Sequence, residues 1–482
     1  MYTTENFTQA DFKPARFESN GEITLRGQKI QYRTVCEDHV FYGEDGKPIA
    51  SAFTYSYFRS DADKTADRPV IFGYNGGPGS ASYYVHMGFL GPRRLSYREL
   101  NRASALGPYE IIDNPDCLLD IADIVIVEPV NTGYGVLLDK SKDKDFFGIE
   151  EDAEALLHVI EHWLHEYDRW LSPKYLAGES YGCTRSAAAA GLAALGGKNR
   201  EYAVSFDGII MIGNTVSPGK YFCREVPAEA AVLGFPTYAA VRWYHHRPTG
   251  QTLEEFVKEA KSFADTEYLL ALYRGEDLSA EERAHITERV CYYTGVSERY
   301  LAERDLKIDD ESFRSEVLRE QGQVVARYDA RITRPAMEPW VREQAEGMHD
   351  DASEDRYGTY FSAAMLGDAA PRLNIHLDRP YVTSSMLWKT WNRESPTGTT
   401  AELLYAAMHK TPGMRTFFAN GWYDICTEIG IVYYTLAHAH LPKDRTFMKG
   451  YPSGHMLYIG EDNVHALCRD IAVFITGGDP TE

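Results

Sequence analysis

Short apolar runs recur along the first half of the chain, each bounded by turn residues. Four of them lie at 70–74, 123–127, 174–178 and 207–213. Runs of this length without alternation are typical of strands buried on both faces of a parallel sheet. Segments of helical periodicity separate them, and this strand–helix alternation is typical of α/β proteins.

Other strand patterns lie nearer the two ends. Segments 23–26 and 52–58 alternate apolar and polar residues, so they predict antiparallel strands that open the fold. Apolar stretches at 414–419 and 446–448 predict two late strands. A final amphipathic helix is predicted over 464–474, and it ends before a pair of glycines.

The middle of the chain has a different pattern. Charged amphipathic helices are predicted over 226–246, 252–274, 279–294 and 309–321, whereas 334–370 is rich in acid, methionine and glycine and is predicted to be irregular. This stretch is too long for a loop and holds no strand signal. We therefore expect a core at 1–216, a helical insertion at 217–373 that roofs the site and shapes its side-chain pocket, and a second core part at 374–482.

The pentapeptide Gly178–Gly182 fits G-x-S-x-G, in which a serine occupies a sharp strand-to-helix turn. A short apolar run precedes it, and an alanine-rich, helix-forming segment at 186–195 follows. Glycines on both sides suit the strained backbone of such a turn. The pattern predicts Ser180 as a nucleophile; an idle serine in an ordinary turn is the alternative.

A nucleophilic serine needs donors for the oxyanion that forms during acyl transfer. The predicted strand at 69–72 runs into the glycine-rich loop Gly73–Ser80. In hydrolases with this turn, one donor comes from such a loop and the other from the residue after the nucleophile. These are the N–H groups of Gly77 and Tyr181. A phosphate-binding loop would end in Gly-Lys-Ser/Thr, which is missing here.

An acid and a histidine should follow the serine, each in a loop after a late strand. Asp424 follows the predicted strand at 414–419, and His455 follows the one at 446–448. Asp424 would orient the imidazole, and His455 would take the serine proton and return it to the leaving group.

Five strings of the chain resemble the serine carboxypeptidases, in the order of that family. They are NGGPGS (Asn75–Ser80), IVEPVNTGYG (Ile126–Gly135), GESYG (Gly178–Gly182), GWYDICT (Gly421–Thr427) and YPSGHMLY (Tyr451–Tyr458). The resemblance, to a leaderless bacterial-type member, implies an α/β-hydrolase fold with a large helical insertion, a Ser–Asp–His triad and removal of single residues from peptide C-termini.

The same resemblance assigns binding of the terminal carboxylate to Asn75 and Glu179. A carboxyl can donate to a carboxylate only when protonated, so Glu179 needs a raised pKa. The chain departs from the family at three places. It has no acidic residue at 83–90, where a partner for that glutamate is usual, Gly73 where tryptophan is frequent, and Ser80 where secreted members often have cysteine.

A rival motif, His158-Val159-Ile160-Glu161-His162, fits the inverted zinc-peptidase signature H-x-x-E-H. Histidines four residues apart share one helix face, so two metal ligands are available. The apolar stripe of this helix leaves His158, Glu161 and His162 on its polar side, however, which favours a solvent-facing role. We expect no metal and no cofactor.

Composition narrows the function classes. The net charge of −21 over 482 residues argues against nucleic acid and against anionic membranes. The first seven residues lack the features of a signal peptide, and the seven scattered cysteines favour reduced thiols, so we expect a cytoplasmic enzyme. Its expected partner is a peptide substrate, and the sequence leaves a homodimer open.

Three function classes remain open beside the zinc peptidase. The leading one is a serine carboxypeptidase. An acyltransferase or esterase on the same scaffold is the second, because one fold serves many reactions. A binding protein with a vestigial site is the third, and a full Ser180–Asp424–His455 set argues against it.

Overall fold

A ten-stranded sheet forms the centre of the computed structural model, which describes residues 7–62, 68–97, 109–198, 200–219, 227–247, 250–336 and 351–482. The strand order is β1-β2-β3-β7-β4-β9-β10-β13-β14, and β8 pairs with β3. The strands are β1 (Arg16–Leu25), β2 (Gln28–Tyr42), β3 (Pro48–Arg59), β4 (Val70–Tyr74), β7 (Asp123–Glu128), β8 (Val136–Leu137), β9 (Lys174–Glu179), β10 (Gly208–Ile212), β13 (Arg415–Gly421) and β14 (Thr446–Tyr451).

Strands β7, β4, β9, β10, β13 and β14 run parallel, and β1 to β3 add an antiparallel edge. The six predicted core strands are confirmed, as is the antiparallel opening. The sequence pattern missed β2, a strand of 15 residues. Two short hairpins lie outside the main sheet: β5 (Arg93–Leu95) with β6 (Ile111–Asp113), and β11 (Gln323–Val325) with β12 (Thr333–Pro335).

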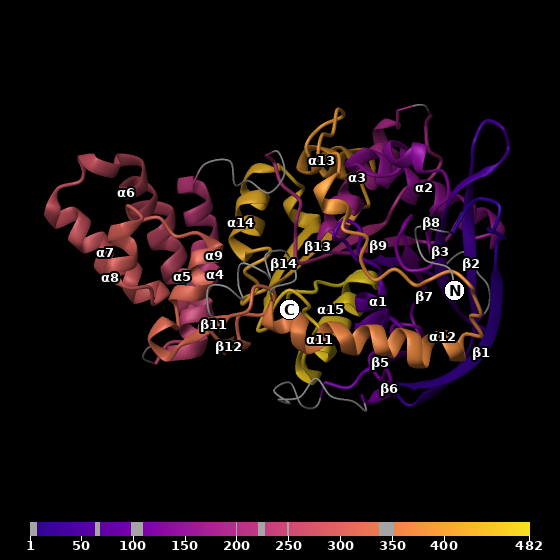
Figure 1. The fold of residues 1–482 in the computed structure, drawn as a ribbon, viewed down its shortest axis with the longest axis horizontal. Helices are drawn as coiled ribbons and strands as arrows, with labels where there is room; N and C mark the ends of the chain where they lie inside the picture. Colours follow the sequence, from indigo (N-terminus) through magenta and orange to yellow (C-terminus); the bar gives the residue numbers. More distant parts are fainter. Residues whose placement is uncertain are drawn as a thin grey trace.

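Side chains of the central strands point alternately into two hydrophobic cores, one on each face of the sheet. In β4, for example, Ile71 belongs to one core, and Val70 and Phe72 belong to the other. Helices α2 (Ile149–Glu166), α3 (Tyr181–Leu195) and α13 (Thr400–Lys410) cover the second core, and α11 (Ala352–Ala364) and α15 (Glu461–Ile475) cover the first (Figure 1). Both faces are thus buried, which explains the uninterrupted apolar runs.

The insertion has a third core of its own. It is built by α4 (Pro227–His246), α5 (Leu253–Phe263), α6 (Leu269–Arg274), α7 (Ala280–Thr294), α8 (Glu298–Glu303) and α9 (Asp310–Glu316), with a π-helical turn at Ala264–Tyr268. These helices extend away from the sheet in Figure 1. They join the main body through Trp422, Tyr423, Ile425 and Ile429, which follow β13 and belong to the same core.

The irregular structure expected over 334–370 is wrong for the described residues from 352 onward. The region predicted to be irregular contains α11, followed by a π-helical turn at Met365–Ala369 and α12 (Ala370–Arg372). This part packs on the core of the sheet, not on the insertion helices. The periodicity of α11 is weak because aromatic and small residues face the core while its first turn is acidic. Residues 337–350 of the same predicted segment lie outside the described residues.

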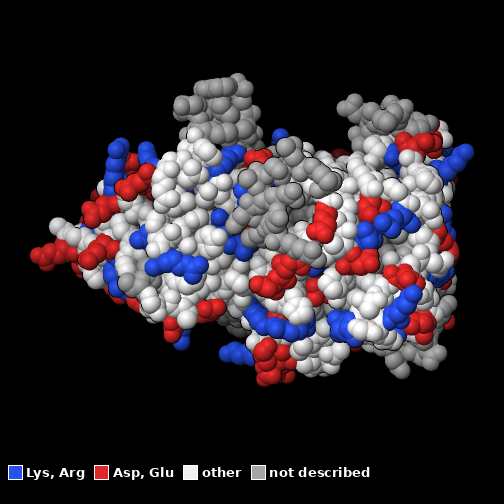
Figure 2. Space-filling view, turned by 90° about the horizontal axis from the view of Figure 1, so that it is seen from below, with Lys and Arg blue, Asp and Glu red and all other residues white. Residues whose placement is uncertain are grey.

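The remaining elements connect the layers. They are α1 (Tyr83–Val85), a π-helical turn at His86–Leu90, α14 (Ile429–His438), and 3₁₀ turns at Lys140–Asp145, Gly275–Asp277, Arg319–Gln321, Leu387–Lys389 and Lys443–Arg445. On the face of the molecule in Figure 2, positive and negative side chains are interspersed. No helix in the described ranges is long and apolar enough to span a membrane. The six described cysteines are free.

Candidate active site

Ser180 lies in the turn between β9 and α3, with φ 60° and ψ −127°. A positive φ is uncommon outside glycine and marks a strained backbone. Its neighbours must be small, because a Cβ at Gly178 would lie 2.2 Å from the carbonyl oxygen of Gly182. The Ser180 amide donates to the carbonyl of Ile212 at 2.8 Å, which ties the turn to β10.

The glycine loop after β4 lies against the start of α3. A Cβ at Gly76 would lie 2.4 Å from the amide nitrogen of Tyr181, so only glycine fits there. Buried Arg185 fixes the loop from behind, since it donates to the Asn75 carbonyl at 2.6 Å and to the Asp152 carboxylate at 2.6 Å. The loop and the helix together bring Gly77 and Tyr181 to the cavity that Ser180 lines.

His455 and Asp424 form a buried pair. Nδ1 of His455 lies 2.7 Å from Oδ2 of Asp424, and both side chains are almost fully enclosed. The loop after β13 holds the carboxylate: the amides of Cys426 and Thr427 donate to Oδ1 at 2.8 and 2.9 Å, and the Thr427 hydroxyl donates to Oδ2 at 2.5 Å. Asp424 is therefore oriented by three donors besides the imidazole.

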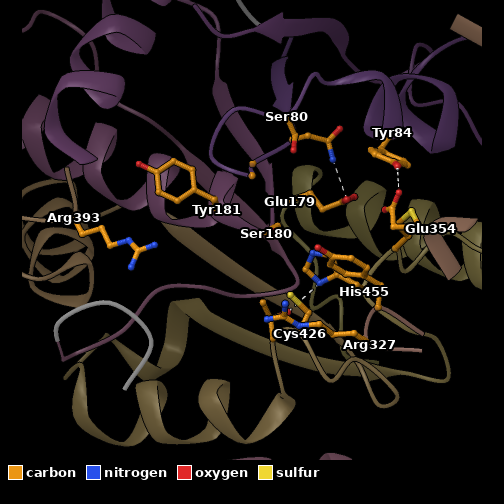
Figure 3. A pocket seen from close by; sticks show the side chains of 16 residues that line it. Ser80, Tyr84, Glu179, Ser180, Tyr181, Arg327, Glu354, Arg393, Cys426 and His455 are labelled. Carbon is orange, nitrogen blue, oxygen red and sulfur yellow. Dashed lines mark hydrogen bonds between the residues drawn. The ribbon is translucent and has the colours of Figure 1, made fainter. Parts of the chain in front are cut away.

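The same pairing sets the charge of the imidazole. Burial on its own lowers the pKa of His455, and the adjacent Asp424 carboxylate more than offsets this, so the net pKa is raised. The backbone amide of His455 donates to the Tyr328 carbonyl at 2.6 Å, which fixes the loop after β14. Ser180 and His455 line one cavity of about 270 Å³, and Figure 3 shows both at its centre.

Asn75 and Glu179 meet beside Ser180. Asn75 Oδ1 accepts the amide of Val85 at 2.9 Å, so its Nδ2 must face the other way, where it donates to Oε1 of Glu179 at 2.9 Å (Figure 3). Burial raises the pKa of Glu179 to about 7, although His455, Tyr458 and Asn75 each lower it in part. The predicted raised pKa is thus present, and desolvation causes it.

The structure also brings residues into the cavity that the sequence pattern did not reveal. One of them is Glu354, in the first turn of α11. Its Oε2 accepts a hydrogen bond from the Tyr84 hydroxyl at 2.7 Å. Arg327, Tyr328, Arg393, Cys426 and Met456 line the cavity as well. The segment 83–90 has no acid, as its sequence shows, but a second carboxyl reaches the site from about 270 residues further along the chain. No local signal marks Glu354.

Of the expected insertion at 217–373, the described residues that line the cavity are Arg327, Tyr328 and Glu354. Among the described residues, none between 230 and 321 lines this cavity. The segment immediately after β11 contributes instead, through Arg327 and Tyr328, together with α11. The insertion helices pack on the loop that carries Asp424, so they support the site from outside.

The H-x-x-E-H segment lies on α2, away from this cavity. Glu161 pairs with Arg200 and accepts the Ala203 amide at 2.8 Å, so its carboxylate is engaged. His158 packs on the Phe41 ring, and Nδ1 of exposed His162 lies 3.0 Å from Nδ1 of His39. The one group of three metal-type ligands found within the described residues is Asp424, Cys426 and His455, which contains the buried pair itself.

The sheet order, the serine at the strained turn and the buried His455–Asp424 pair define an α/β-hydrolase. The sequence model of the serine carboxypeptidases matches residues 46–221, which contain both the glycine loop and Gly178–Gly182. Over these residues the chain is similar to the serine carboxypeptidases. A search of curated protein sequences found no match.

Among the solved structures similar to this chain, Kex1 supports the fold. Kex1, a prohormone-processing carboxypeptidase from Saccharomyces cerevisiae, is 15% identical with a TM-score of 0.55, over 92% of this chain and 91% of that one. A haloalkane dehalogenase loop variant from Bradyrhizobium elkanii is 13% identical, with a TM-score of 0.34 over 96% and 97%. Proline iminopeptidase from Mycobacterium smegmatis is 12% identical, with a TM-score of 0.36 over 91% and 97%.

Proposed function

We propose that this protein is a serine carboxypeptidase that releases single residues from the C-terminus of peptides through an acyl-enzyme on Ser180. The observation that carries the proposal is the Asn75–Glu179 pair, a buried amide and carboxyl directly beside the nucleophile. An esterase needs only the triad and the oxyanion donors. A group that binds a free carboxylate next to the scissile bond selects a peptide terminus instead.

The chemistry follows from the positions of three side chains. Nε2 of His455 takes the Ser180 proton as Oγ attacks the last peptide carbonyl, and the carbonyl electron pair moves onto its oxygen. The N–H groups of Gly77 and Tyr181 stabilise that oxyanion. As the tetrahedral intermediate collapses, the C–N bond breaks and His455 gives its proton to the leaving amine. Water then hydrolyses the ester in the same two steps.

Asp424 keeps the imidazole productive throughout this cycle. Its carboxylate accepts Nδ1–H, so Nε2 carries the lone pair that receives the serine proton. The adjacent negative charge stabilises the imidazolium that forms in each step. The three donors to Asp424 hold the carboxylate in place without access to water, because its side chain is fully buried.

Recognition of the terminal carboxylate follows from how the amide of Asn75 is fixed. One hydrogen of Nδ2 is used by Glu179 Oε1, and the second is left to donate to a substrate. Because Oε1 accepts from Asn75, the proton of neutral Glu179 belongs on Oε2, which has no hydrogen-bond partner among the described residues. A protonated Oε2 and the Asn75 amide then offer two donors to the two oxygens of a carboxylate.

A time course on a peptide library, followed by mass spectrometry, tests this function. The proposed activity yields ladders of single C-terminal losses, and peptides that end in an amide are cleaved poorly or not at all. Ester cleavage without a ladder would assign the protein to the esterases or acyltransferases. Loss of peptidase activity with a chelator, together with resistance to a fluorophosphonate, would assign it to the zinc peptidases.

A further inference from the structure

Glu354 occupies a position that has a different use elsewhere in this chain. It is the third residue of α11, after the N-cap Asp351. At α5, α7 and α13 the glutamate at this position, Glu255, Glu282 or Glu402, reaches back to the N-cap amide and completes a capping box. The Glu354 side chain turns into the active-site cavity instead, where Tyr84 holds it (Figure 3).

The surroundings of Glu354 leave room for a carboxylate and fix its direction. Tyr84 is itself held by its neighbours, since its ring stacks on Tyr83 with centroids 4.3 Å apart and packs on Phe361 at 4.9 Å. One turn along α11, a Cβ at Gly358 would lie 2.8 Å from Oε2 of Glu354. Glycine at 358 therefore keeps open the space that the carboxyl group occupies.

The place of Glu354 relative to Glu179 decides which part of a substrate it meets. Burial raises the pKa of Tyr458, and the nearby Glu179 and Glu354 carboxyls raise it further. Figure 3 shows Glu179 and Glu354 to the same side of Ser180, with Arg393 on the opposite side. Under the proposed function, Glu179 and Asn75 bind the terminal carboxylate. The side chain of that same terminal residue is then the group that faces Glu354.

We propose that Glu354, held by Tyr84, selects peptides whose C-terminal residue is lysine or arginine, an inference that rests on the proposed function. A cationic side chain satisfies the buried carboxylate by charge and hydrogen bonding, whereas a neutral one leaves it without a counter-ion. The net charge of −21 also draws cationic peptides toward the protein.

The charges around Glu354 affect its ionisation and that of His455. Arg327 lies beside His455 and Cys426 in Figure 3, and it lowers the pKa of His455 in part. Burial raises the pKa of Glu354 to about 7, with Asp351 and Asp355 raising it and Tyr84 and His455 lowering it. An arriving guanidinium or ammonium group therefore meets a carboxyl that ionises readily in its presence.

The test compares blocked dipeptides that share the penultimate residue and end in arginine, citrulline or leucine. Citrulline keeps the shape of arginine without its charge, so the arginine-to-citrulline ratio of kcat/KM isolates the electrostatic contribution. We expect a ratio of at least about tenfold in the wild type. Glu354→Gln should bring the ratio to about one, mainly through KM, and Tyr84→Phe should lower it in part.

Controls keep the outcomes separate. Glu255→Gln changes a glutamate at the equivalent helix position, outside this cavity, and should keep the wild-type ratio. Thermal unfolding shows whether each variant folds. The arginine-to-citrulline ratio of the wild type tests the inference even if a variant fails to fold. Leucine cleavage with a wild-type ratio near one, or a ratio that survives Glu354→Gln, overturns the inference alone. Failure to cleave any of the three dipeptides overturns the proposed function and the inference with it.

Discussion

Asn75 Nδ2 and Glu179 Oε1 lie 2.9 Å apart, and the amide of Val85 at Asn75 Oδ1 leaves no freedom in how this contact is oriented. The hydrogen bond fixes which oxygen of Glu179 carries the proton when the group is neutral. It couples the glycine loop to the residue before Ser180, so under the proposed function carboxylate binding and catalysis share one rigid unit. Several properties of the enzyme should depend on this unit.

The pH dependence of KM should follow the proton on Glu179. Its pKa is raised to about 7, so the donor on Oε2 is present below pH 7 and is lost as the pH rises through that value. KM for free-acid peptides should therefore rise above pH 7, because an ionised Glu179 repels the terminal carboxylate. Glu179→Gln keeps a donor at every pH and should flatten this rise.

Peptides that end in leucine are the right substrates for that measurement. The pKa of Glu354 is also raised to about 7, so its ionisation can add to the pH dependence of KM. A neutral terminal side chain reduces this contribution of Glu354 to KM. His455 must be neutral to act as a base, so its ionisation limits kcat at low pH instead. Amidated peptides should show no rise of KM. Equal KM profiles for acid and amide substrates would remove Glu179 from carboxylate binding.

Ser180→Ala should abolish labelling by a fluorophosphonate and lower kcat by about four to six orders of magnitude, since members of a triad act as a unit. His455→Ala should be nearly as damaging, because the hydroxyl loses its base. Stopped-flow or long-incubation assays with one blocked dipeptide measure both variants. Substantial peptidase activity in either variant would contradict the mechanism.

Asp424→Asn should lower kcat by about four orders of magnitude, because the amide can donate to Nδ1 and favours the wrong imidazole tautomer. Thr427→Val removes a single donor to the same carboxylate and should have a far smaller effect, within about tenfold. KM should change little in both variants. Similar losses of kcat in the two variants would mean that the loop geometry, not the tautomer, controls the rate.

Arg185→Ala should lower the free energy of unfolding by about 3–5 kcal/mol, because it leaves buried Asp152 without its counter-ion. It also frees the Asn75 carbonyl, so the remaining folded enzyme should have a raised KM for free-acid peptides. Urea unfolding measures the first effect. Arg299→Ala, at an exposed ion pair with Glu303, is the control and should leave stability nearly unchanged.

Phe256→Ala tests the role of the insertion. This side chain is fully buried in the third core, so the change should lower the free energy of unfolding by about 3–5 kcal/mol. The arginine-to-citrulline ratio should stay at its wild-type value, because no described residue between 230 and 321 lines the cavity. A changed ratio in the well-folded variant would restore the insertion as a determinant of specificity.

The parts of the fold that follow from local pattern could be predicted from the sequence. Buried parallel strands appear as continuous apolar runs, and the strained turn at Ser180 requires Gly178. The order of Ser180, Asp424 and His455 along the chain follows from the topology of the sheet. These residues lie at strand ends, where sequence position and place in space are closely linked.

Glu354 and the position of the insertion could not be predicted in the same way. Glu354 depends on how α11 packs across the sheet core, which brings it to Tyr84 over a separation of 270 residues. Its own sequence signal, an acid in the first turn of a helix, is also that of an ordinary helix start. The insertion helices show their apolar faces in the sequence, but periodicity does not say which other surface those faces cover.

The contact between the insertion and residues 422–429 has a consequence for how the rate of this enzyme can be controlled. The loop that presents Asp424 to the imidazole is packed against a helical module that extends away from the sheet and makes no described contact with the cavity. A mechanical disturbance of that module, by heat or by a protein bound at its tip, would reach the acid of the triad before it reached the substrate. Such a disturbance would lower the rate of turnover from a distance and leave the specificity for peptides unchanged.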